Sequence, residues 1–378
     1  MKIIDSCQFN LKVIVVICSC FFSCGSEKFE VAPSEFYEVA ITDFNYDTLQ
    51  LKIDSLTVIP QNSQLIQGDS ALFVFNKSIS SLEFYNLHTS EFSRVRLEVD
   101  GPNGIGGTTG LYYISKDTII GARVNQLIFL NSEGKVFKRL EISLDDLGMY
   151  PDIMVQGTKP VIKRGDSLIF GLFPHLDPHN GDHLSNWKSF VEIDLKSGVA
   201  SSFGDLPKEM IDNVYGINFM NFSFVMNQNE ELVISFTPLK DLFKIDLNSK
   251  ERNLERIPLK SPNFSNAEKL PDEDNNEMRY VMRHYLFQPS FDALFFDGES
   301  YLRVLQEPIS EGEFESMSWA KKKTLIIYND QFEAIYSREF NSKSLSYNMI
   351  FPYKKGYLGR ITSKSEEHFQ FLSIQKNE

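Results

Sequence analysis

Three histidines and two aspartates lie within nine residues of one polar segment, at His175, Asp177, His179, Asp182 and His183. Imidazole nitrogens and carboxylate oxygens are donors that suit Zn²⁺ and similar divalent ions. Two prolines and a glycine in the same segment oppose a helix that would place the histidines on one side. No His-Glu-x-x-His zinc-hydrolase pattern occurs either. The segment is therefore a divalent-metal site or a solvated polar loop, and no other cofactor is predicted.

A second group of candidates consists of basic residues that could bind an anion, namely Arg123, Arg279, Arg283, His284, Arg303 and Arg360. Guanidinium groups recognise carboxylates through two parallel hydrogen bonds. If these side chains converge, they could hold an anionic ligand or the carboxylate of a glycan. The alternative is that they form ion pairs at the surface or between the blades of a propeller in an acidic protein.

Signatures of covalent catalysis are missing from the sequence. No Gly-x-Ser-x-Gly elbow occurs, and all four cysteines lie at or before Cys24. The glycine-rich segment from Gly101 to Gly107 lacks the Lys-Ser/Thr that follows in a phosphate-binding loop. This segment is predicted to be a tight connector in which glycine supplies positive φ angles.

The elements that must position these residues are β-strands. From residue 48 onward, alternating apolar strands joined by short Asx, Ser, Gly or Lys turns recur as hairpins roughly every 55 residues. The chain also holds 32 Phe and 15 Tyr, residues that favour pleated, half-buried strands. Six such units predict an all-β fold, a six-bladed β-propeller.

The last unit is one strand short, whereas the segment from about Leu49 to Val58 has no partner near it in sequence. This N-terminal strand is predicted to complete the last blade and close the ring, which removes an exposed edge. A β-sandwich or two smaller β-domains are the alternatives. The predicted organisation is a signal peptide over 1–23, a lipidated polar tether over 24–45 and a single propeller domain over 46–378.

Long insertions are predicted to share one face of the propeller. They fall between the second and third strands of a blade or between blades, and in a propeller these connections emerge on the same side. Loops on a rigid scaffold are where binding and catalysis concentrate, so this elaborated face is the predicted functional face.

The N-terminus reads as an export signal with a lipidation site. Lys2 and Lys12 precede the ten-residue apolar run from Val13 to Phe22, which is too short to span a membrane. The segment Phe21-Phe22-Ser23-Cys24 resembles a lipobox, which predicts acylation at Cys24; Cys20 is a weaker competing site, and an ordinary signal peptide is the alternative. The expected location is the cell envelope, as an outer-membrane lipoprotein that is periplasmic or surface-exposed.

The negative net charge limits the classes of partner that the protein is expected to bind. The formal net charge is −13 at pH 7, and nucleic acids and anionic lipid surfaces require basic proteins. No nucleic acid partner is expected. Attachment to the membrane would come from the acyl anchor, which leaves an envelope protein or an extracellular ligand as the partner of the domain.

Two motifs resemble those of an uncharacterised propeller-type lipoprotein family of Bacteroidetes-type bacteria. They are Gly101-Pro102-Asn103-Gly104, and the aromatic stretch from Tyr285 to Pro308 that ends in a Tyr-Arg strand. This sequence has Leu302 where a second tyrosine would be expected. The resemblance implies a propeller fold and an envelope lipoprotein, and it implies no activity.

These observations lead to two hypotheses. The first is a non-catalytic, membrane-anchored lipoprotein whose elaborated propeller face binds a ligand or a protein. The second is a metal-assisted propeller lyase or hydrolase that acts on glycan or peptide, with the histidine segment holding the metal.

Overall fold

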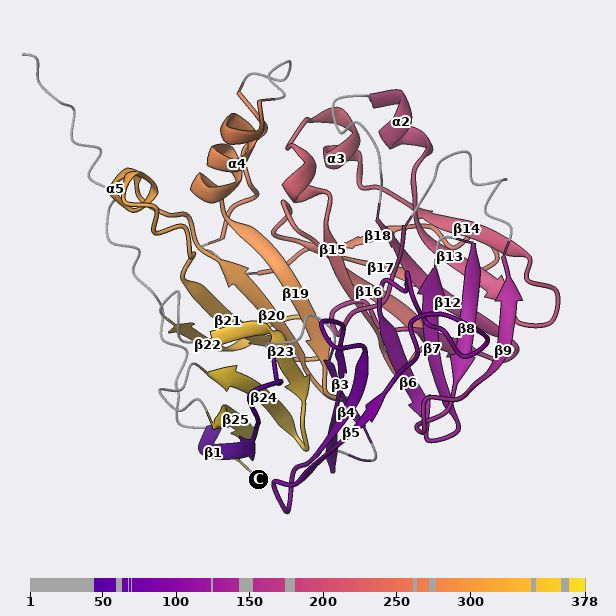
Figure 1. The fold of residues 1–378 in the computed structure, drawn as a ribbon. Coiled ribbons are helices and arrows are strands. Elements are labelled where there is room, and N and C mark those ends of the chain that lie inside the picture. Colours follow the sequence, from indigo (N-terminus) through magenta and orange to yellow (C-terminus); the bar gives the residue numbers. More distant parts are fainter. Residues whose placement is uncertain are drawn as a thin grey trace, which may run out of the picture. The chain divides into compact units, whose positions relative to one another are not determined.

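The structure, a computed structural model, describes residues 44–58, 63–66, 68, 70–123, 125–142, 152–173, 181–260, 264–271, 277–340, 345–361 and 367–377. All of them fall within one unit, Glu38–Glu378. They form six antiparallel sheets, each built on a path of four strands and arranged as the blades of a β-propeller (Figure 1). The fold predicted from the sequence is therefore confirmed.

The strands of each blade follow one another along the chain, except in the last. Blade 1 contains β2 (Ser63–Ile66), β3 (Ala71–Asn76), β4 (Ser81–Asn86) and β5 (Phe92–Arg96). Blade 2 contains β6 (Leu111–Ser115), β7 (Thr118–Arg123), β8 (Gln126–Leu130) and β9 (Val136–Glu141). Blade 3 contains β10 (Asp152–Met154), β12 (Ser167–Phe173), β13 (Lys188–Asp194) and β14 (Ala200–Asp205), and the short β11 (Ile162–Arg164) also pairs with β12.

The second half of the ring repeats this order. Blade 4 contains β15 (Phe222–Met226), β16 (Glu231–Phe236), β17 (Leu242–Asp246) and β18 (Glu255–Ile257). Blade 5 contains β19 (Ser290–Phe296), β20 (Tyr301–Gln306), β21 (Lys323–Tyr328) and β22 (Ala334–Phe340). Blade 6 contains β23 (Leu345–Pro352), β24 (Gly356–Ile361), β25 (His368–Lys376) and β1 (Phe44–Lys52).

Burial explains why the middle strands are almost continuously apolar. All six residues of β3, β20 and β21 are buried, because each blade packs against a neighbour on both faces. Such strands show runs of apolar residues where a half-buried strand would show strict alternation. The outer strands are partly exposed and carry more charge, as in β5 and β9. The hydrophobic core is thus divided among the interfaces between blades.

Ring closure is made by the N-terminal strand, as predicted. β1 pairs antiparallel with β25 over nine residues, from Phe44 opposite Lys376 to Lys52 opposite His368. The strand begins and ends earlier than the predicted Leu49 to Val58. It stops because the Asp54 carboxylate accepts the Leu56 N–H (3.1 Å) while the Thr57 N–H bonds to the Asp54 carbonyl (3.0 Å), which forms a turn.

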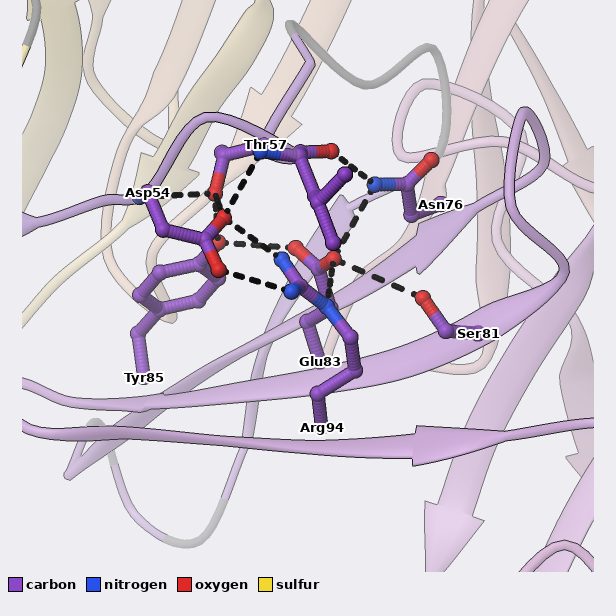
Figure 2. Close-up of polar contacts among 8 residues, drawn as sticks. Asp54, Thr57, Asn76, Ser81, Glu83, Tyr85 and Arg94 are labelled. Carbon is purple, nitrogen blue, oxygen red and sulfur yellow. Dashed lines mark hydrogen bonds and ion pairs between the residues drawn. The ribbon is translucent and has the colours of Figure 1, made fainter.

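A buried polar network, here called the closure latch, joins this turn to blade 1 (Figure 2). Arg94 of β5 donates two hydrogen bonds to Asp54, at 2.7 and 2.9 Å, and one to Glu83 of β4, at 2.8 Å. Tyr85 donates to the second oxygen of Glu83 at 2.7 Å. Its other members are Thr57, Asn76 and Ser81. Because Asp54 directly follows the outermost strand of blade 6, the latch ties that blade to blade 1.

Charge in the latch is balanced by direct contact. Glu83 is fully buried, and it accepts hydrogen bonds from Arg94, Tyr85, Asn76 and Ser81. The hydrogen bonds from Arg94 hold the pKa of Asp54 well below its usual range, and those to Asp54 raise the pKa of Arg94. A bidentate, partly buried arrangement of this kind is among the stronger ion pairs in proteins.

The helices lie at one end of the blades. Figure 1 shows α2 (Gly181–Asn186), α3 (Lys208–Asp212), α4 (Met278–Phe287) and α5 (Glu311–Glu315) beyond the same ends of the sheets. α2 and α5 connect the second and third strands of blades 3 and 5, whereas α3 and α4 connect successive blades. This is the one-sided elaboration expected from the sequence. Among the described residues, no helix is both long enough and apolar enough to cross a membrane.

The glycine-rich connector between blades 1 and 2 also has the predicted conformation. Gly101 and Gly107 have φ angles of +86° and +80°, a region that L side chains rarely adopt. The Gly104 N–H bonds to the Gly101 carbonyl at 2.9 Å, which closes a turn.

Candidate functional site

The first strands of the blades line the central channel, and a hairpin of blade 3 reaches into it. β2 contacts β6 and β23, and β19 contacts β15 and β23. The hairpin joins β10 to β11, with Gln156 and Lys159 bridged by backbone hydrogen bonds. Its Thr158 carbonyl accepts the Phe224 N–H of blade 4 at 3.2 Å. A Cβ at Gly157 would lie 3.0 Å from the Ser63 carbonyl of blade 1. The hairpin therefore bridges the channel between blades 3, 4 and 1.

Lys159 is the buried cation of this hairpin. Its side chain is 1% exposed, and its ammonium group donates to Asn221 Oδ1 and lies 5.3 Å from the Phe222 ring centroid. Lys159 forms no ion pair in the described part of the chain. Burial lowers the pKa of Lys159 to about 7, and the charge of Asp292 opposes this shift.

Asp292 is placed by a β-bulge in the first strand of blade 5. Phe291 pairs with Leu305 and Ala293 with Val304, so Asp292 is the extra residue. Its Oδ2 accepts hydrogen bonds from Tyr285 (3.2 Å), Ser290 (3.4 Å) and Gln306. Burial raises the pKa of Asp292, and Lys321 and Lys159 oppose the rise.

Two further lysines act on Asp292, namely Lys321 in the connection between α5 and β21 and Lys323 at the start of β21. Lys321 donates to the carbonyls of Tyr285 (3.0 Å) and Gln288 (2.6 Å) and to Ser290 Oγ (3.2 Å). Burial lowers the pKa of Lys321 to about 8, and it also lowers the pKa of Lys323. In both cases the charge of Asp292 acts in the opposite direction.

These four residues, here called the lysine cluster, hold an unequal number of charges. Lys159, Lys321 and Lys323 are all less than a tenth exposed, and one carboxylate, Asp292, acts on all three. Burial of each lysine disfavours its protonated ammonium form. Lys159 and Lys321 form no ion pair in the described part of the chain. An anionic group placed beside these two would offset their charge, so the chemistry that the cluster supports best is binding of a carboxylate or phosphate.

The basic residues proposed from the sequence do not converge. Arg123, Arg303 and Arg360 lie on the second strands of blades 2, 5 and 6, and no described contact joins them. Arg303 is fully buried between blades 4 and 5, where it donates to Ser235 Oγ (2.8 Å), to the Leu239 carbonyl (2.6 Å) and to the Lys240 carbonyl. Burial lowers the pKa of Arg303 to about 10. Its contacts are those of a packing residue.

Arg279, Arg283 and His284 lie on α4. The first two are exposed, and Arg283 pairs with Glu311 at 2.6 Å. His284 is buried, with Nε2 3.0 Å from the Glu268 carbonyl, and burial lowers its pKa. The next residue, Tyr285, donates to Asp292. α4 therefore contributes Tyr285 to the surroundings of Asp292, whereas Arg283 pairs with Glu311.

The metal and lipidation predictions fall largely outside the described residues. His175, Asp177, His179 and Cys24 are not described, and His183 is exposed on α2, which also contains Asp182. Within the residues that are described, no group of three or more His, Cys, Asp or Glu side chains could hold a metal ion. Acylation at Cys24 and metal binding by the histidine segment stay predictions.

The lysine cluster was missed from the sequence, although one signal was present. Asp292 interrupts the apolar strand Ser290–Phe296, and a carboxylate in a strand buried on both faces needs partners. The lysine run 321–323 and the turn that contains Lys159 carry no comparable signal, since most lysines in such positions are solvated.

The chain matches one protein family and resembles solved structures of the same fold. A family model described as a domain of unknown function, DUF4221, matches residues 39–341. The crystal structure of a DUF4221 member from Bacteroides vulgatus has a TM-score of 0.74 and 18% identity, with 90% of this chain and 100% of that chain covered. A protein from Bacteroides fragilis, named as exported, has a TM-score of 0.54 and 10% identity, with 90% and 97% covered. No curated protein matches this chain. At these identities the structural similarity shows the fold alone.

Proposed function

Since this chain belongs to the DUF4221 family, as its sequence motifs predicted, and that family's description assigns no activity, we propose a function from the site itself. The protein is a non-catalytic lipoprotein of the cell envelope, anchored through acyl chains on Cys24. Its helix-bearing face binds a ligand that carries an acidic group. The lysine cluster holds that group.

The excess of buried positive charge is the observation that carries this proposal. The chain as a whole has a formal charge of −13, so two buried lysines, Lys159 and Lys321, that form no ion pair in the described part of the chain are not a consequence of a basic composition. Uncompensated buried charge destabilises a fold. A bound carboxylate or phosphate would offset this cost and gain charge-assisted hydrogen bonds.

The proposed location is supported by the signal-like N-terminus. Lys2 and Lys12, the apolar run and the lipobox-like segment together have the pattern of an exported lipoprotein. The Bacteroides fragilis protein of the same fold is named as exported. Acyl anchoring would leave the propeller free to meet an envelope protein or an extracellular ligand.

Isothermal titration calorimetry of the purified chain with D-glucuronate and with inorganic phosphate tests the proposal. At pH 6.5 we expect saturable binding of at least one of these anions and none of D-glucose, their uncharged control. Affinity should fall as the pH rises to 8.5, because Lys159 and then Lys321 lose their protons near pH 7 and 8. The preferred anion distinguishes a carboxylate ligand from a phosphate ligand.

The matched variants are Lys159→Met and Lys196→Met, since Lys196 is an exposed surface lysine. Lys159→Met should weaken anion binding about tenfold or more, as expected for a buried charged hydrogen bond, and Lys196→Met should leave it unchanged. Absence of anion binding, or equal binding by both variants, would exclude the lysine cluster as the site.

A further inference from the structure

A cavity of about 360 Å³ lies in the central channel, and no residue of the lysine cluster lines it. Every blade contributes to its wall. The lining residues are Ser63, Gln64 and Leu65 of blade 1; Tyr112 of blade 2; Gly157, Pro160 and Ile162 of blade 3; Val225 and Met226 of blade 4; Phe295 and Phe296 of blade 5; and Ile350, Phe351 and Pro352 of blade 6. Its size is at the lower end of the range for small-molecule sites.

At blades 4, 5 and 6 the cavity wall lies toward the end of the channel opposite the helices. Met226, Phe296 and Pro352 are the last residues of β15, β19 and β23, whereas α3 and α4 precede the first residues of β15 and β19. Gly157 and Pro160 bring the bridging hairpin into its wall. Lys159 of the same hairpin contacts Asn221 and Phe222, at the start of β15. The hairpin thus contributes both to the cavity wall and to the lysine cluster.

The lining has no charged side chain. Its residues include no Asp, Glu, Lys, Arg or His. The Gln64 amide is occupied, because it donates to the Tyr113 carbonyl (2.9 Å) and accepts the Tyr113 N–H (3.0 Å). A charged ligand would lose its hydration here without gaining a partner.

Tyr112 supplies one polar group. Its hydroxyl has no hydrogen-bond partner among the described residues, and burial raises the pKa of Tyr112 to about 12. The phenol therefore stays protonated at neutral pH and is a neutral donor. Tyr112 is half-buried at the cavity wall, so its hydroxyl is available to a ligand as a donor.

We propose that this cavity is a second binding site, for a small, uncharged, largely apolar molecule that carries one hydrogen-bond acceptor. Apolar walls from six blades bury the body of the ligand, and the Tyr112 hydroxyl donates to its acceptor. The cavity is a separate site from the lysine cluster, because none of the four cluster residues lines it.

The test uses prodan, an uncharged naphthyl ketone whose emission shifts to the blue in an apolar environment. We expect saturable binding to the purified chain at a stoichiometry of one. Met226→Trp fills the cavity and should abolish the shift, whereas Met278→Trp should not, because Met278 is 71% exposed on α4. Circular dichroism checks that both variants are folded.

Tyr112→Phe distinguishes binding that uses the Tyr112 hydroxyl from non-specific hydrophobic binding of prodan. Loss of one hydrogen bond should weaken prodan binding roughly threefold to tenfold, and this measurement stands if Met226→Trp does not fold. Lys196→Met, a change at an exposed lysine away from the cavity lining, should leave prodan binding unchanged. The proposal is overturned by the absence of a saturable shift, by equal binding to both tryptophan variants, or by equal binding to Tyr112→Phe and the unmodified chain.

Discussion

The closure latch and the lysine cluster are both buried polar networks, yet they treat charge in opposite ways. In the latch, Arg94 lies between two carboxylates, and Figure 2 shows its guanidinium directed at both Asp54 and Glu83. In the cluster, Lys159 and Lys321 lack an ion pair in the described part of the chain. Lys321 has three hydrogen-bond acceptors, but these are uncharged and do not neutralise it.

The two networks show that satisfied hydrogen bonds and balanced charge are separate properties of a buried network. A network with both properties stabilises a specific contact, here the seam between blades 6 and 1. A network with the first property alone leaves a residual field, which attracts an ion of the opposite sign. Substitutions in the two networks should therefore change stability in opposite directions.

Arg94→Met should produce the largest effect. It leaves Glu83 buried without its cation, and removal of one partner from a buried ion pair typically costs about 3 to 5 kcal/mol. Urea unfolding of the purified chain measures the loss. The control is Arg96→Met on the same strand, because Arg96 is exposed and should change the free energy of unfolding by less than about 0.5 kcal/mol. Equal effects of the two substitutions would show that the latch does not stabilise the seam.

Lys159→Met should act in the opposite direction and stabilise the protein in the absence of ligand. Replacement of a buried charged group by an apolar one of similar size is often stabilising by about 1 to 3 kcal/mol. The gain has a predictable pH dependence. The pKa of Lys159 is about 7 in the folded protein and near 10.5 when exposed, so the unfolded chain binds more protons between these values.

The unmodified chain should therefore become more stable, relative to Lys159→Met, as the pH rises from 7 to 10.5. Below pH 7 both states are protonated and the difference is constant. Urea unfolding at pH 7 and pH 9.5 checks this, with Lys196→Met as the exposed control. A stability difference that is independent of pH over this interval would mean that Lys159 is not desolvated.

The architecture could be predicted because it depends on patterns that repeat. Six alternating hairpins and one unpaired N-terminal segment were enough to give six blades and the closure by β1. The boundary of β1 was missed because the end of a strand depends on one side chain, Asp54, whose partner Arg94 is forty residues away. The repeated alternation of apolar residues predicts the strands. It does not predict a polar contact between residues that are far apart in the sequence.

The candidate site was harder to predict for the same reason. Lys159, Asp292 and Lys321 come from three separate segments, and only the fold brings them close enough for their charges to interact. Clusters that are close in sequence, such as the histidine segment, are easy to notice. An arginine within an apolar strand, such as Arg303, suggests a binding role in the sequence. In the structure, Arg303 is buried between two blades, where it bonds to Ser235.

Asp54→Asn should give the smallest effect on the free energy of unfolding. It tests whether the Asp54 carboxylate stabilises the closure latch through its charge. Asp54 is partly exposed, so loss of its charge should cost only about 1 kcal/mol at pH 7. The hydrogen bonds from Arg94 lower the pKa of Asp54 in the folded protein, so the unfolded chain takes up a proton first as the pH falls. The advantage of the unmodified chain over Asp54→Asn is therefore complete above pH 5. It should shrink steadily below pH 4, as protonation of the unfolded chain removes it. Urea unfolding at pH 7, 4 and 3 measures this, and an advantage that persists undiminished at pH 3 would contradict an ionic contribution of Asp54 to the latch.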